Sequence, residues 1–164
     1  MIENLIKDEH GMYGNMHCKW LEQQLEVMIA EDVSIEYASL CADSLNSIND
    51  NLINDICRAA IAYAEEFCEM VGQEPPKVNA IRDILQYIEF GTLQIDEPED
   101  ESIPVVHLGG GCDWEPEHGI EMIIRNGELI YLGAYNGEWA WGNSEQYEED
   151  YNYAYVIKHI KNKE

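Results

Sequence analysis

The chain has 164 residues, and its 33 acidic side chains against 9 basic ones give a formal net charge of −24. Such a surface repels the phosphates of nucleic acids and anionic lipid headgroups, so we expect no nucleic acid and no membrane as partner, whereas a basic protein fits the charge. No stretch of about 18 apolar residues is present, and acids stand near the start where a signal peptide would be basic and apolar, so we expect a cytoplasmic protein.

The apolar fraction and the cysteines favour a folded, reduced protein. Apolar residues make up 46% of the chain, which is enough nonpolar area to form a core, and the length fits one α+β domain spanning residues 1–164. The odd number of cysteines, at positions 18, 41, 57, 68 and 112, predicts free core thiols rather than disulfides. We expect no cofactor.

A loose two-residue alternation opens the chain. Residues 12–30 place Leu25, Val27 and Ile29 at alternate positions, which predicts a short β-hairpin. A helix through the segment WLEQQLEVMIA is the alternative.

Two helices follow, and a shorter third one comes after them. Residues 34–46 carry apolar side chains at helical spacing, with Asp32 or Ser34 as the N-terminal cap. Residues 49–71 carry a continuous apolar stripe, for which Ser47-Ile-Asn-Asp50 resembles a capping box and Gly72 a left-handed end. These two helices should form an antiparallel pair, and residues 78–88 should form the third.

Beyond the third helix, apolar residues recur at every second position, as in strands. GTLQID is extended, the acidic segment 96–102 is a surface loop, and the runs IPVVHL, GIEMII and ELIYLGAY are strands. Asn126-Gly127 is a hairpin turn because both central residues of a type I′ turn need positive φ. Asn136-Gly137 repeats this signal, and EWAWG is a candidate further strand. The expected fold is therefore α+β: an N-terminal hairpin, two to three helices and an antiparallel meander with the helices on one face, followed by a C-terminal helix.

The segment VHLGGGCDWEPEHG, residues 106–119, gathers side chains that carry chemistry. A metal could be held by side chains of this loop together with His107 on the preceding strand, the candidates in the loop being Cys112, Asp113, Glu115, Glu117 and His118. Paired Cys or His units of the usual zinc spacing are missing, however. A Cys112–His118 dyad could supply a nucleophile, although the surrounding acids disfavour a thiolate. The third interpretation is architectural: Trp114 packs on the sheet, His118 binds loop carbonyls and Glu117 accepts loop amides.

Aromatic residues near the C-terminus form two more candidate features. Trp139 and Trp141 alternate, which favours packing, with an exposed binding patch as the alternative. The tyrosines at 147, 151, 153 and 155 stand among acids and could hold Lys or Arg side chains, with a solvated tail as the alternative.

The stretch from Cys112 to Trp141 resembles an uncharacterised bacterial domain family with the signature C-x-W-x-x-E-H-G-x-E followed by a hairpin, and the likeness extends over about residues 34–141. The signature positions in this chain are Cys112, Trp114, Glu117, His118, Gly119 and Glu121. The resemblance implies a small cytoplasmic protein, and some related families are associated with toxin immunity. It implies no activity, no cofactor and no catalytic or metal-binding residue.

Charge and resemblance together predict an acidic, non-enzymatic protein-binding module of the bacterial cytoplasm, such as an immunity-type inhibitor of a basic toxin. The alternative is a metal- or thiol-dependent enzyme centred on Cys112 and His118.

Overall fold

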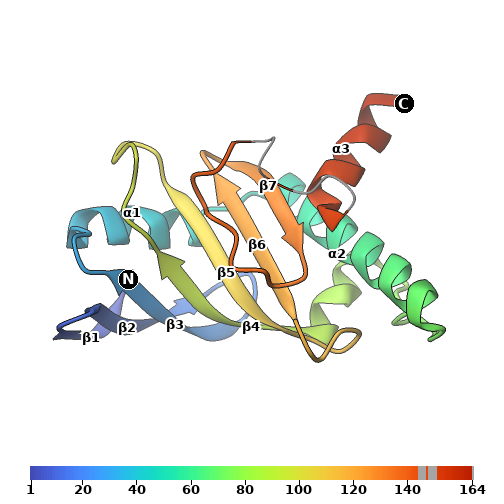
Figure 1. Cartoon of the computed structure of the whole chain (residues 1–164), viewed down its shortest axis with the longest axis horizontal. Helices are drawn as coiled ribbons and strands as arrows, with labels where there is room; N and C mark the ends of the chain where they lie inside the picture. The colour runs from blue at the N-terminus through green and yellow to red at the C-terminus, as the bar shows by residue number, and fades with distance from the viewer. Residues whose placement is uncertain (144–146, 148–150, 164) are drawn as a thin grey trace.

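The structure is a computed structural model that describes residues 1–143, 147 and 151–163, with the backbone alone for 160–163. Its helices and strands follow in the order β1 (Glu3–Asp8), β2 (Gly11–Cys18), β3 (Gln23–Ala30), α1 (Ile35–Asn46), α2 (Asp50–Val71), the 3-10 helix η1 (Ile81–Tyr87), β4 (Ile88–Ile95), β5 (Val105–Cys112), β6 (Ile120–Arg125), β7 (Glu128–Gly133) and α3 (Tyr153–Lys163). The strands form one seven-stranded sheet in chain order (Figure 1). The predicted α+β class is confirmed.

The N-terminal hairpin is confirmed as β2 and β3, and it belongs to the same sheet as the later strands. Leu25, Val27 and Ile29 are buried, as their alternation predicts, so the helical alternative is wrong. The sheet is mixed, because β3 pairs parallel with β4 whereas all other neighbours are antiparallel. Parallel neighbours need a long crossover, and α1, α2 and η1 supply it. The predicted meander is therefore correct for β4 to β7.

The helices begin and end where local side chains satisfy the backbone. The Ser34 side chain accepts a hydrogen bond from the Tyr37 amide, as predicted, and caps α1. The capping box predicted at Ser47 is wrong: Asn49 caps α2 by accepting from the Leu52 amide, because Ser47 already ends α1. Gly72, at φ 74°, ends α2 as predicted.

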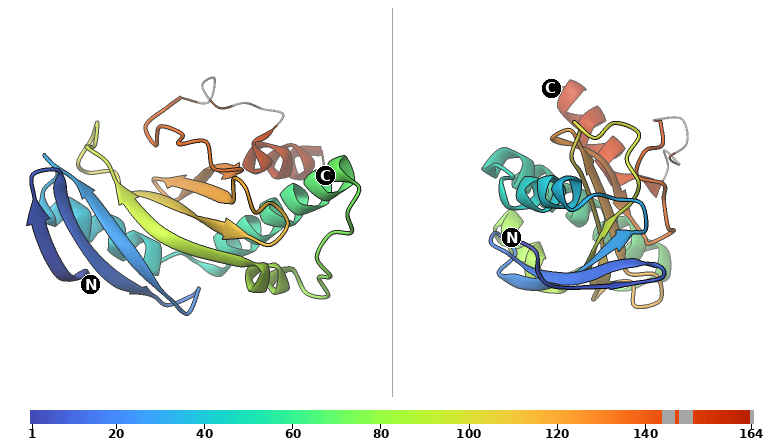
Figure 2. Two further views of the ribbon diagram at one scale, coloured as in Figure 1. Left: turned by 60° about the horizontal axis from the view of Figure 1, so that its bottom comes forward. Right: turned by 90° about the vertical axis from the view of Figure 1, so that its left-hand side faces the viewer.

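The helices cover the face of the sheet opposite to the segment that follows β7. In Figure 1, α1 and α2 lie behind the sheet, while the chain after β7 crosses in front of β5 and β6. Figure 2, right, shows α1 and the N-terminal strands as two layers. The core fills the space between helices and sheet, and α3 packs against α2 and β7. None of the described helices is long and apolar enough to cross a membrane.

The segment after β7 differs from its prediction. The Asn126-Gly127 turn is confirmed with φ of 53° and 75°, but around Asn136 only Gly137 has a positive φ, at 71°. Residues 134–143 form no strand. The Arg125 guanidinium donates to the carbonyls of Ala140 and Gly142, both at 2.9 Å. Hydrogen bonds from this side chain thus hold backbone carbonyls that would otherwise bond to a neighbouring strand.

Candidate functional site

Three side chains beneath the segment that follows β7 form what we call the polar centre: Asp96, His107 and Glu121. His107 and Glu121 come from the paired strands β5 and β6 and are 2% and 0% exposed. His107 Nε2 lies 2.6 Å from Glu121 Oε2. Charged groups are seldom buried unless they are paired, and this pair satisfies that condition.

Asp96 stands on the other side of the imidazole, just beyond the end of β4. Its Oδ2 lies 3.7 Å from His107 Nδ1, which is too far for a hydrogen bond, so this buried nitrogen has no hydrogen-bond partner. Burial disfavours the charged imidazole, but Asp96 and Glu121 favour it more strongly, so the pKa of His107 is raised to about 9. His107 in turn lowers the pKa of Asp96. The raised pKa of His107 favours a charged imidazole between Asp96 and Glu121 at neutral pH.

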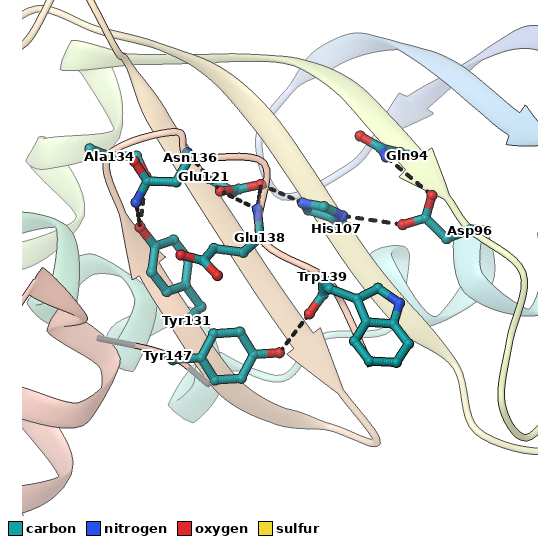
Figure 3. A network of polar contacts seen from close by, with 10 residues as sticks. All are labelled: Gln94, Asp96, His107, Glu121, Tyr131, Ala134, Asn136, Glu138, Trp139 and Tyr147. Atoms are coloured by element: carbon teal, nitrogen blue, oxygen red, sulfur yellow. Dashed lines mark hydrogen bonds and ion pairs between the residues drawn. The ribbon is translucent and has the colours of Figure 1, made fainter. Parts of the chain in front are cut away.

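Glu121 also holds the segment 134–139, which we call the strap. The amide of Asn136 donates to Glu121 Oε1 at 3.1 Å, and the amide of Glu138 donates to both carboxylate oxygens at 3.2 Å (Figure 3). The Tyr131 hydroxyl donates to the Ala134 carbonyl at 2.7 Å. The strap is thus fixed on the sheet by hydrogen bonds to a buried carboxylate.

The strap and the segment after β4 border a shallow, open acidic hollow of about 530 Å³. Its lining carries four carboxylates and one indole, from Asp96, Glu97, Glu99, Glu138 and Trp139. Asp96 therefore belongs both to the polar centre and to the wall of the acidic hollow. The Trp139 side chain is 54% exposed, whereas Trp141 is 9% exposed and lies 6.0 Å from the Arg125 guanidinium. The packing prediction thus holds for Trp141, and the exposed-patch alternative fits Trp139.

The signature loop, residues 112–119, does not bring Cys112 and His118 together as a dyad. Cys112 is 7% exposed and its thiol donates to the Glu115 carbonyl at 3.8 Å. Burial raises the pKa of the Cys112 thiol to about 12, which leaves it protonated at neutral pH. His118 Nδ1 instead lies 2.6 Å from Glu115 Oε2.

Glu115 has the architectural role that the sequence assigned to Glu117. Its Oε1 accepts the amides of Glu117 at 2.9 Å and His118 at 3.3 Å, whereas the Glu117 side chain is exposed. Trp114 is 3% exposed, so its predicted burial is confirmed, and its ring packs edge-on against Tyr63 of α2. The loop is ordered largely by its own side chains and backbone.

One group in the loop could hold a metal ion. Ligand atoms of Glu115, Glu117 and His118 lie within 4.8 Å of one another. Cys112 and His107, which the sequence suggested as further ligands, are not part of this group in the described portion of the chain.

Sequence reasoning missed the most buried polar contact in the described residues. It placed Glu121 in the linear signature, but Glu121 pairs with His107, 14 positions earlier. The signal was present, because GIEMII and VVHL each carry one ionisable residue inside an apolar strand. The tyrosine surface is only partly described: Tyr147 and Tyr153 are buried, Tyr151 is exposed, and Glu145, Glu148, Glu149 and Asp150 lie outside the described residues.

Comparison with known proteins assigns the chain to a family. It belongs to the family described as Domain of unknown function (DUF6985), whose model matches residues 1–139. The match includes the strands of the sheet, the polar centre and the strap, and it begins well before the region expected from the signature. No curated protein and no solved structure matches the chain.

Proposed function

We propose that this member of the DUF6985 family is a non-enzymatic module that binds a basic segment of another protein in the acidic hollow. The observation that carries the proposal is the exposed Trp139 indole beside four carboxylates in one hollow. An immunity-type inhibitor of a basic toxin in the bacterial cytoplasm is the form of this function that we favour.

The chemistry of the hollow suits an arginine or lysine side chain. Carboxylates attract the cationic head, and an indole face attracts a guanidinium or ammonium within about 6 Å of the ring centre. The net charge of −24 attracts a basic partner over longer distances and speeds encounter, and added salt weakens both effects.

The polar centre supports binding because it orders the strap beforehand. Glu138 and Trp139 are placed by the hydrogen bonds from the strap to Glu121, so a partner does not have to order this segment when it binds. A preformed site avoids the entropy that is otherwise lost at the moment of association.

An acetylated tetra-arginine amide is a defined probe for this proposal. We expect its affinity, measured by calorimetry at low ionic strength, to fall about tenfold for Trp139→Ala and for the double variant Asp96→Asn with Glu99→Gln. The matched control removes two exposed carboxylates of α1, by Glu36→Gln with Asp43→Asn, and should change affinity about twofold at most. Equal losses in the double variant and in the control would show that only net charge matters and would refute a defined site.

A second test uses protein partners from the native host. Captured partners should be basic proteins that remain bound at moderate salt to the wild type but not to Trp139→Ala. Retention of the same proteins by both forms would count against the acidic hollow.

A metal- or thiol-dependent enzyme centred on Cys112 and His118 is the second candidate, and the grouping of Glu115, Glu117 and His118 favours its metal form. Metal analysis of protein purified without chelator tests that form, and the rate of thiol labelling at Cys112 tests the other. Stoichiometric metal that is lost in His118→Gln would favour the enzyme over the binding module; a metal-free protein with a slowly labelled thiol would eliminate it.

A further inference from the structure

A second hollow, of about 210 Å³, borders the other end of the strap, at Ala134 and Asn136. We call it the aromatic hollow. Its remaining lining comes from α2, the signature loop, the residue Tyr151 before α3 and the first residue of α3, and consists of Tyr63, Phe67, Met70, Glu115, Tyr151 and Tyr153. It shares no lining residue with the acidic hollow.

The rings that form the aromatic hollow are held by their own packing. Tyr63, Phe67 and Met70 follow one another at helical spacing on α2 and so share one stripe. The ring of Tyr153 stacks on Tyr63 with centroids 5.0 Å apart, and Phe67 meets Tyr63 edge-on at 6.4 Å. Tyr63 and Tyr153 are buried, whereas Met70 and Tyr151 are 62% and 51% exposed and mark the entrance. The hollow is therefore a preformed aromatic site with an open rim.

Glu115 is the acidic residue in this lining. Glu115 is 5% exposed, and its oxygens accept two backbone amides and lie beside His118 Nδ1. These contacts use three of the about four lone-pair positions of a carboxylate, which leaves one acceptor position for a ligand. Among the described residues that line the hollow there is no lysine and no arginine, and the side chain paired with Glu115 is the half-exposed His118 ring.

Ring faces and a carboxylate together select a cation with an apolar body. The negative face of an aromatic ring attracts ammonium groups, and aromatic sites of this kind recognise alkylated amines. An anion would be repelled by Glu115, and a hydrated metal ion would gain nothing from the rings. The volume is smaller than the roughly 300–1,000 Å³ of sites for drug-sized ligands, so it fits a single side chain or a small amine.

We propose that the aromatic hollow binds an alkylammonium group, supplied either by a free amine or by a lysine side chain of a bound protein. This site is separate from the acidic hollow and does not depend on the function proposed for it.

The test titrates the full chain, labelled at its methionine methyl groups, with n-butylammonium, tetramethylammonium and uncharged n-pentanol, and follows the Met70 methyl signal by NMR. We expect saturable shifts at millimolar concentration with the ammonium ions and at least about fivefold weaker binding of n-pentanol. Equal binding of n-pentanol, or no saturable shift with any ammonium ion, would overturn the proposal.

Two variants test whether the change in the Met70 methyl signal arises from binding in the aromatic hollow. Tyr151→Ala removes a half-exposed ring and should weaken ammonium binding at least about fivefold without unfolding the chain, which circular dichroism checks. Trp139→Ala should leave it unchanged, because Trp139 lines only the acidic hollow. Binding that survives Tyr151→Ala at full strength would contradict the assignment. Trp139→Ala is expected to weaken binding of the tetra-arginine probe and not binding of the ammonium ions. Failure of the acidic hollow and failure of the aromatic hollow can therefore be told apart.

A last arm separates the two sources of the amine. Lysine capped by an acetyl group and a methylamide represents a protein side chain, and tetramethylammonium represents a free alkylated amine. Tighter binding of the first identifies a lysine of a bound protein, and tighter binding of the second identifies a small amine; both outcomes support the alkylammonium site.

Discussion

Two histidine–carboxylate pairs in this molecule have the same contact distance in different surroundings. His107 lies 2.6 Å from Glu121 with side chains that are 3% and 0% exposed, and His118 lies 2.6 Å from Glu115 with side chains that are 58% and 7% exposed. In the inner pair, His107 and Glu121, neither side chain reaches water, so each charge depends on the other. In the outer pair, His118 and Glu115, the imidazole can be hydrated if its partner is lost. Burial rather than contact distance decides how much each pair matters.

The carboxylates of Glu115 and Glu121 also accept backbone amides at different separations in the sequence. Glu115 accepts amides that are 2 and 3 positions away, so it shapes a local turn. Glu121 accepts amides that are 15 and 17 positions away and therefore fixes a tertiary arrangement, the strap on the sheet. Loss of the inner carboxylate should be felt across the fold, and loss of the outer one mainly within the signature loop.

The largest expected effect is that of Glu121→Gln. It leaves the His107 imidazolium buried without its closest counter-charge, and breaking one side of a buried pair costs about 3–5 kcal/mol. Urea unfolding followed by tryptophan fluorescence measures the loss. A free energy of unfolding within about 1 kcal/mol of wild type would show that the buried pair has no structural role.

The inner pair should also make stability depend on pH. The pKa of His107 is raised to about 9 in the fold, against an ordinary value of about 6.5 in an unfolded chain. Because the folded value is the higher one, the stabilisation is complete below about pH 6.5 and is lost as pH rises through about 9. The stability difference between wild type and His107→Gln should shrink by about 3 kcal/mol from pH 6 to pH 10. Comparing the two forms at each pH cancels the other titrating groups, and a constant difference would contradict a charged His107.

A smaller effect is expected from Glu115→Gln in the outer pair. The amide oxygen of glutamine still accepts one or two of the loop bonds, so the free energy of unfolding should fall by about 1–2 kcal/mol. The same urea titration gives the value. A loss equal to that of Glu121→Gln would mean that burial does not distinguish the two pairs.

The smallest effect should come from His118→Gln. Its side chain is 58% exposed, and exposed ion pairs contribute about 0–1 kcal/mol. Thermal or urea unfolding at two salt concentrations would detect it. A loss above about 2 kcal/mol would show that the signature loop is held mainly by this ring.

Local periodicity predicted much of the fold and little of the site. Alternation predicted β2, β3 and the strands β5 to β7, and helical spacing predicted α1 and α2. It could not predict β1, whose six residues are all exposed and so carry no buried pattern. The parallel pairing of β3 with β4 was also hidden, because the intervening helices determine which strand returns beside β3.

The polar centre and the strap could not be predicted from the sequence for a related reason. Glu121 holds the strap, and Arg125 holds the residues that follow it, through bonds from side chain to backbone. Such bonds leave no period in the sequence. The linear signature grouped Glu121 with Cys112 and His118, whereas the fold places Glu121 with His107 and Asp96. An ionisable residue within an apolar strand was the available signal for that grouping.

The most direct test of the account is to map where a cationic peptide binds. Amide signals of the chain, followed by NMR during titration with the acetylated tetra-arginine amide, should shift most at Asp96, Glu97, Glu99 and residues 136–139, with saturation at a single affinity. Shifts of similar size spread over the exposed acids of α1 and α2, or centred on the signature loop, would contradict a strap-built site for a basic partner.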